Sequence, residues 1–169
     1  MATTYRAIAE VAVGASGAAN IQFTSIPATY TDLHLVASLR TTTNDGYQSV
    51  TVNFNGSPSY SVRRLYNLGS DSASADYWAI APADSASLMT ANTYGNLSIY
   101  LPNYTGTTNK SASVDVVVEN NVSGGVSWQG LNAGLATLTT AITTITLAPY
   151  GGNNFKQYST ATLYGIKNS

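Results

Sequence analysis

Few residues in this chain could carry out acid–base, nucleophilic or metal chemistry. The only histidine, His34, lies between Leu33 and Leu35 in a predicted strand, and the chain contains no cysteine. A catalytic or metal-bound histidine needs partner groups, and a zinc site without cysteine would need carboxylates at a spacing that the sequence does not contain. Serine is abundant enough for a Ser-His-Asp triad, but no GxSxG motif marks a nucleophile. We therefore interpret His34 as an ordinary sheet residue.

The eight acidic residues do not form a recognisable catalytic or metal-binding pattern either. Asp115 and Glu119 fall four residues apart in one predicted strand, which places them about 13 Å apart on one face. That distance exceeds the roughly 5–9.5 Å expected for the carboxylate pair of a glycosidase. The acids between Asp71 and Asp84 do not follow the spacing of a calcium-binding loop. The sequence predicts no catalytic residue, no metal ligand and no cofactor, so we expect that the protein is not an enzyme.

Tyrosine is the one residue type that is clearly in excess, with 12 copies. Tyrosine and tryptophan offer a large amphipathic contact area that suits protein interfaces or the stacking of sugars. The aromatic residues in or beside predicted loops are the candidate interface residues: Tyr47, Tyr77, Trp78, Tyr104 and Tyr150. The alternative for each of them is an ordinary place in the core with its hydroxyl or indole group near water.

Composition restricts the class of protein further. At 169 residues the chain is expected to form one domain, residues 1–169, and its charged fraction of 9% is far below the roughly 25% of ordinary soluble domains. A net charge of −1 argues against nucleic-acid binding, which needs basic patches. No apolar run is long enough to span a bilayer, and the first residues, MATTYRAIAEVAVG, do not have the layout of a secretory signal. We expect neither nucleic acid nor membrane as a partner.

The stretch from Ile21 to Arg40 indicates the fold class. Residues 21–25 alternate apolar and polar side chains, Pro27 stops the strand, and Leu33 begins a second alternating strand that runs to Arg40. A chain that turns on Ile-Pro and sends a long strand back is typical of a β-sandwich or barrel. Residues 48–55 and 60–66 are predicted to pair as a hairpin around Asn55-Gly56, and residues 67–75 are predicted to form a loop. Further strands are expected at residues 5–13, 77–80, 94–101, 110–119, 126–138, 142–147 and 161–166. With no convincing amphipathic helix, the sequence predicts a single all-β antiparallel sandwich of about 8–10 strands.

Several segments resemble a family of small virion proteins of tailed bacteriophages, including cyanophages. They are FTSIPATYTDLHLVASLR, VNFNGSPSYSVRRLY, IYLPNYTGTTNKSASVDVVVENN, ITTITLAPYGGNNF and STATLYGIK, and the resemblance covers nearly the whole chain. It implies a jelly-roll-like β-sandwich in the virus particle, either a cement protein that decorates the capsid or part of a fibre. The family has no catalytic motif to carry over.

This resemblance implies partners and a location. The expected partners are the major capsid protein or other virion proteins, together with further copies of the chain in a dimer or trimer. The protein is expected on the capsid surface or in a fibre of the virion after synthesis in the host cytoplasm. The first hypothesis is a protein that stabilises the head by bridging capsid subunits. The second is a head- or tail-fibre module that binds host surface glycans through loop aromatics, and the third, much weaker, is a glycan-cleaving enzyme.

Overall fold

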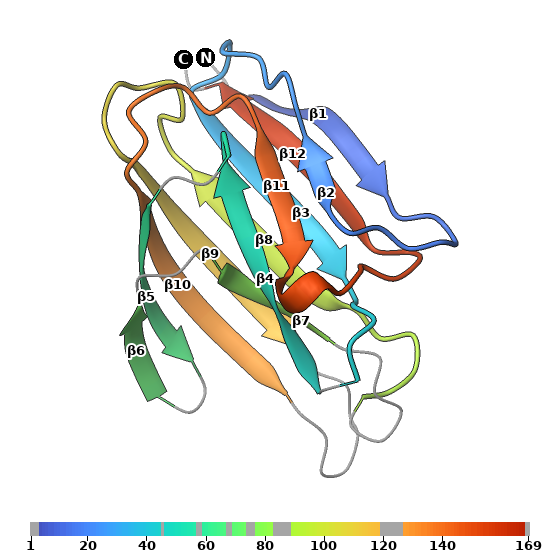
Figure 1. Ribbon diagram of the computed structural model, residues 1–169. Helices are drawn as coiled ribbons and strands as arrows, with labels where there is room; N and C mark the ends of the chain where they lie inside the picture. The colour runs from blue at the N-terminus through green and yellow to red at the C-terminus, as the bar shows by residue number, and fades with distance from the viewer. Residues whose placement is uncertain are drawn as a thin grey trace.

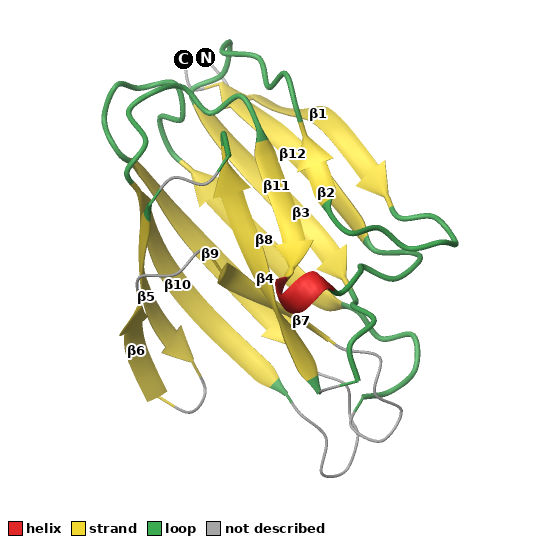
Figure 2. Ribbon diagram, viewed as in Figure 1, coloured by secondary structure: helices red, strands yellow, loops and turns green. Residues whose placement is uncertain are grey.

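The computed structural model describes residues 4–44, 46–56, 59–66, 69–73, 77–82, 89–118 and 127–167, with 69–73 and 77–82 described by their backbone. Within these ranges the chain folds into two antiparallel β-sheets that pack face to face (Figures 1 and 2). In spatial order, the larger sheet contains β1 (Thr4–Ala12), β12 (Thr160–Lys167), β3 (Asp32–Leu39), β8 (Gly95–Leu101), β9 (Lys110–Val118), β10 (Trp128–Ala136), β5 (Tyr60–Tyr66) and β6 (Gly69–Ala73). The smaller sheet contains β2 (Ile21–Phe23), β11 (Ile145–Pro149), β4 (Tyr47–Phe54) and β7 (Tyr77–Pro82), and a short 3₁₀ turn η1 (Tyr150–Gly152) follows β11.

Eight of these strands form a jelly roll. β1 pairs with β12, β2 with β11, β3 with β8 and β4 with β7, and successive pairs belong alternately to the larger and the smaller sheet. This is a two-stranded ribbon rolled into a sandwich, the defining topology of jelly rolls. The predicted all-β, jelly-roll-like sandwich is confirmed.

Two inserted hairpins raise the number of strands above the 8–10 that the sequence predicts. β5 and β6 are inserted between β4 and β7, and β9 and β10 between β8 and β11. Both hairpins add to the same edge of the larger sheet, beyond β8. β6 lies within residues 67–75, which are predicted as a loop because Gly, Ser and Asp dominate there. Its backbone pairs with β5 all the same, so the ladder and not the side-chain pattern defines this strand.

The predicted hairpin of residues 48–55 with 60–66 is wrong. β4 pairs with β11 and β7, whereas β5 pairs with β10 and β6 in the other sheet. Asn55 and Gly56 have positive φ, as a tight turn requires, but the turn is a corner between sheets. The Phe54 amide donates to the Tyr60 hydroxyl, and the two rings pack edge to face, 6.0 Å apart, in the core. Both strands bury their apolar faces in one core, from opposite sheets.

The core lies between the two sheets and consists of the inward-facing alternate residues of each strand. Leu33, Leu35, Val52, Phe54 and Leu163 are completely buried. Complete burial of such a side chain contributes roughly 1.5–3 kcal/mol each to folding. The pattern that predicts the strands therefore also identifies the core.

The corner between β2 and β3 is fixed by the turn that follows β8. The Tyr104 hydroxyl donates to the Pro27 carbonyl, and the Asp32 carboxylate accepts hydrogen bonds from the Asn103 amide (2.9 Å) and the Tyr100 hydroxyl (2.8 Å). Asp32 thus bonds to an amide 71 residues away in sequence. Tyr104 is completely buried, so of the two alternatives considered for it the structure has the place in the core. Its ring packs in the core, and its hydroxyl donates to the carbonyl of Pro27, which lies outside the strands.

We predict that Tyr104→Phe lowers the free energy of unfolding by about 0.5–1.5 kcal/mol, because the hydrogen bond to the Pro27 carbonyl is lost. Urea denaturation followed by fluorescence measures the change. Tyr158→Phe, at an exposed tyrosine, is the matched control and should change stability by less than about 0.5 kcal/mol. Equal effects of the two substitutions would contradict this account of the corner.

Candidate interaction surfaces

The outer face of the larger sheet exposes apolar side chains where β9, β10 and β5 lie side by side. The strand register places Asp115 beside Leu131 and Leu131 beside Leu65 in one row across these strands. Leu65 is 61% exposed, Leu131 49% and Val117 47%. Contiguous exposed apolar side chains mark interaction surfaces more often than singly scattered ones do. We name Leu65, Leu131, Leu135 and Val117 the apolar patch.

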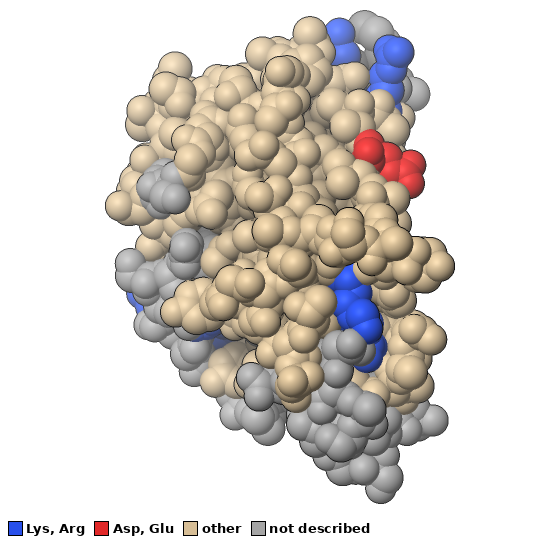
Figure 3. Space-filling model, turned by 45° about the vertical axis from the view of Figure 1, so that its right-hand side comes forward, with Lys and Arg blue, Asp and Glu red and all other residues tan. Residues whose placement is uncertain are grey.

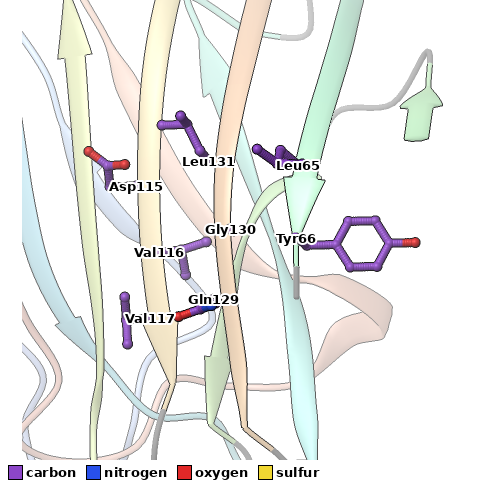
Figure 4. Close-up of a pocket in the computed structure, with 8 residues that line it drawn as sticks. All are labelled: Leu65, Tyr66, Asp115, Val116, Val117, Gln129, Gly130 and Leu131. Atoms are coloured by element: carbon purple, nitrogen blue, oxygen red, sulfur yellow. The ribbon is translucent and has the colours of Figure 1, made fainter. Parts of the chain in front are cut away.

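The surface around this patch is hollowed. A hollow of about 320 Å³ is lined by Leu65, Val117, Leu131, Asp115 and Gln129, together with Tyr66 and backbone of β9 and β10. Figure 4 shows Asp115 and Leu131 at one end of this group, Gln129 and Val117 at the other, and the Tyr66 ring pointing away from them. A second hollow of about 470 Å³, on the Ala133 side of Leu131, is lined by Arg63, Leu65, Ser113 and Ala133 among others. Leu131 therefore lies between two depressions that could accept side chains from another surface.

The middle of the same outer face carries a polar group around His34. The His34 Nε2 atom lies 2.8 Å from the Ser98 hydroxyl, and its Nδ1 atom lies 3.5 Å from the Tyr5 hydroxyl. Burial lowers the pKa of His34, so the imidazole is neutral at pH 7. The hydrogen bond from Tyr100 to the Asp32 carboxylate, with burial, raises the pKa of Tyr100 to about 12. The His34–Ser98 and Tyr100–Asp32 pairs each join the neighbouring strands β3 and β8, and Tyr5 reaches His34 from β1, on the far side of β12. Sequence spacing could not bring these residues together.

A hydroxyl beside a neutral imidazole has the composition of a nucleophile and its base, but the rest of a triad does not follow here. A tyrosine hydroxyl, and not a carboxylate, faces the second ring nitrogen of His34, while Asp32 is engaged by Tyr100 and Asn103. β3 is paired on both edges, to β12 and β8, so its backbone amides in this row serve the ladders. In the described part of the chain this group has no oxyanion-binding donors around it. We interpret His34 as a sheet residue whose ring nitrogens are satisfied by neighbours.

The outer face of the smaller sheet is uncharged. No Asp, Glu, Lys or Arg occurs in β2, β4, β7 or β11. Polar side chains on it bond to the neighbouring strand β11. Gln22 donates to the Thr146 hydroxyl (3.0 Å), and Thr51 donates to the Ala148 carbonyl (3.0 Å). On the side of the molecule shown in Figure 3, neutral residues cover most of the described surface, and charged groups lie in a few separate places. Burial of Asp32, Arg40 and Lys110 lowers the surface charge further.

The structure separates the five predicted interface aromatics. Tyr47 (44% exposed) in β4 and Tyr150 (57% exposed) in η1 lie at the same end of the smaller sheet, where Asn153 donates to Gln48 (2.9 Å). Tyr77 and Trp78 belong to β7, and their side chains lie outside the described part of the structure. Tyr104 is buried, as described above.

The apolar patch was not predicted from the sequence, although it leaves a signal there. In β9 the alternation KSASVDV breaks at Val117, which follows Val116 directly. In β10 the leucines Leu131 and Leu135 alternate with the buried residues Asn132 and Gly134, so large apolar groups occupy the outward phase. An apolar residue on the phase opposite to the buried one predicts a second contact surface.

No family model matches the chain, and no curated protein and no solved structure matches it significantly. Within the described residues, none of the helical segments is long and apolar enough to cross a membrane. The same residues contain no group of three or more His, Asp or Glu side chains close enough to hold a metal ion.

We predict that His34 makes the protein less stable in mild acid. The unfolded chain binds a proton near pH 6.5, whereas folded His34 has a lower pKa and binds it only at lower pH. The contribution of neutral His34 to the free energy of unfolding is therefore fully present above pH 6.5. It falls as the pH drops below 6.5, by at most about 1.4 kcal/mol per pH unit. Urea unfolding at pH 7.5 and pH 5.5 measures the fall, and His34→Gln, which cannot titrate, should reduce it. An unchanged pH dependence in that variant would show that His34 keeps its ordinary pKa.

Proposed function

We propose that the chain is a structural protein of a bacteriophage virion, a decoration or cement protein that stabilises the capsid by bridging its subunits. The observation that carries this proposal is the exposed apolar patch with its hollows on the outer face of the larger sheet. Interfaces between proteins are depleted of charge at their centre and enriched in apolar groups, as this surface is. The proposal also rests on the resemblance of the sequence segments to phage virion proteins.

A bridging protein needs two contact surfaces, and the sandwich offers two. The uncharged outer face of the smaller sheet lies on the opposite side from the apolar patch. Contact with a neutral polar surface does not require charged groups to lose water, which lowers the cost of packing it against another protein. Jelly rolls occur in capsid and lectin domains, but a fold alone does not specify a function, so the surfaces carry the argument.

The second candidate is a fibre module that binds host glycans. Tyr47 and Tyr150 favour it, since both are exposed at one end of the smaller sheet beside the polar Gln48 and Asn153. Aromatic rings next to amide groups can stack on a sugar and hydrogen-bond its hydroxyls. The two candidates differ in the number of copies that one particle needs.

We predict a copy number close to that of the major capsid protein. Quantitative mass spectrometry of purified virions, with isotope-labelled peptides of both proteins, measures the ratio. A ratio within a small factor of one supports a decoration protein spread over the capsid. A ratio of a few per cent or less would contradict it and favour the glycan-binding fibre, and absence from the particle would overturn both.

A further inference from the structure

We propose that the apolar patch binds a second copy of this chain, forming a two-fold symmetric dimer through the outer faces of the two larger sheets. The inference uses the same surface as the proposed function and names its partner. It concerns the purified chain in solution, so its test is independent of the virion.

The first argument is the position of two opposite charges on either side of the patch. Arg63 in β5 and Asp115 in β9 are both exposed, and neither makes an ion pair with the residues that the structure describes. The register places Arg63 beside Ala133, and Asp115 beside Leu131, two residues along β10. Two strand spacings of about 4.8 Å and one step of about 6.8 Å put the Cα atoms of Arg63 and Asp115 roughly 12 Å apart. Within one copy the two side chains do not pair.

A two-fold axis in the plane between two copies brings the opposite charges of different copies together. If the axis crosses β10 between Leu131 and Ala133, midway between the two charges, Arg63 of each copy lies over Asp115 of the other. Symmetry forms this pair twice, because residues exchange reciprocally across an isologous interface. One face that carries both charges is therefore complementary to itself.

The second argument is the shape of the surface beside that axis. Leu131 and Leu65 are neighbours across β10 and β5, and the hollows of about 320 Å³ and about 470 Å³ flank Leu131. The same operation brings Leu131 of each copy close to Leu65 of the other, and each leucine faces a depression. Leu131 and Ala133 are thus nearest the centre of the predicted interface, and Leu65 and the two charged residues lie around them at about equal distances.

The third argument is area. A two-fold axis that crosses β10 overlaps at most the five strands from β8 to β6, which are about 4.8 Å apart and about seven residues long and cover roughly 570 Å². Stable interfaces bury about 800 Å² on each partner, so an overlap of this size predicts a weak dimer that dissociates on dilution. Pairing through this face leaves the uncharged faces of the two smaller sheets pointing outward on opposite sides, where they are available for contacts with other proteins.

The test is the mass of the full chain in solution, by sedimentation equilibrium over a range of concentrations. The wild type is expected to approach twice the chain mass of 17.7 kDa at the highest concentrations and to dissociate on dilution. Leu131→Glu places two carboxylates beside the axis and should leave a monomer. Tyr158→Glu, at an exposed tyrosine in the loop before β12, is the matched control and should leave the dimer intact. Thermal unfolding of each variant checks that the fold is retained.

Charge reversal tests the symmetry itself. Arg63→Asp and Asp115→Arg should each raise the dissociation constant about tenfold, and the double variant should restore it to within about threefold. A wild type that stays monomeric throughout would overturn the proposal, as would a dimer that Leu131→Glu does not disrupt. A double variant that remains as weak as the single ones would overturn the proposed axis. Each of these results leaves the copy number in virions as a separate question.

Discussion

The unequal width of the two sheets is the constraint on which the rest of this structure depends. Two hairpins extend one edge of the jelly roll, so an eight-stranded sheet packs on a four-stranded one. The smaller sheet contacts the widened region mainly through β7, which lies against β8, β9 and, less extensively, β10. Strands β10 and β5 lie largely beyond this contact, and their inward positions combine the buried apolar residues Val62 and Ala136 with the polar residues Asn132 and Arg64. Large apolar side chains also occur on the outward positions of β9, β10 and β5, and they produce the apolar patch.

The chain holds this wide sandwich together without disulfides and with few charges. The polar groups that it buries are used as internal connections: the Lys110 ammonium donates to the carbonyls of Gly106, Thr108 and Leu138, and burial lowers its pKa. Arg40 donates to the Thr90 and Thr93 carbonyls. Because these cations bond to backbone, they fix loops in place and remove charge from the surface. A neutral exterior and a fixed set of loops suit a protein whose role is to pack against neighbours.

The alternation of apolar residues was sufficient to predict the fold class and nearly all strands, because the core lies on one phase of each strand. It could not predict which strands pair. Asn55-Gly56 is typical of a hairpin turn, yet β5 lies in the opposite sheet from β4, and the Tyr60 hydroxyl accepts a hydrogen bond from the Phe54 amide at the corner between them. The aromatic candidates were chosen for their closeness to loops, a criterion that does not separate exposed Tyr150 from buried Tyr104. Contacts such as His34 with Ser98 depend on pairing across 64 residues and need the three-dimensional structure.

The central claim is that the apolar patch is covered by protein when the chain performs its function. Hydroxyl-radical footprinting of the isolated chain at high dilution and of the assembled particle, read out by mass spectrometry, tests it directly. Oxidation of Leu65, Leu131 and Val117 should fall severalfold on assembly relative to exposed side chains outside the contact faces. Equal oxidation of the three residues in both samples would contradict the account, because it would mean that this face stays open to solvent.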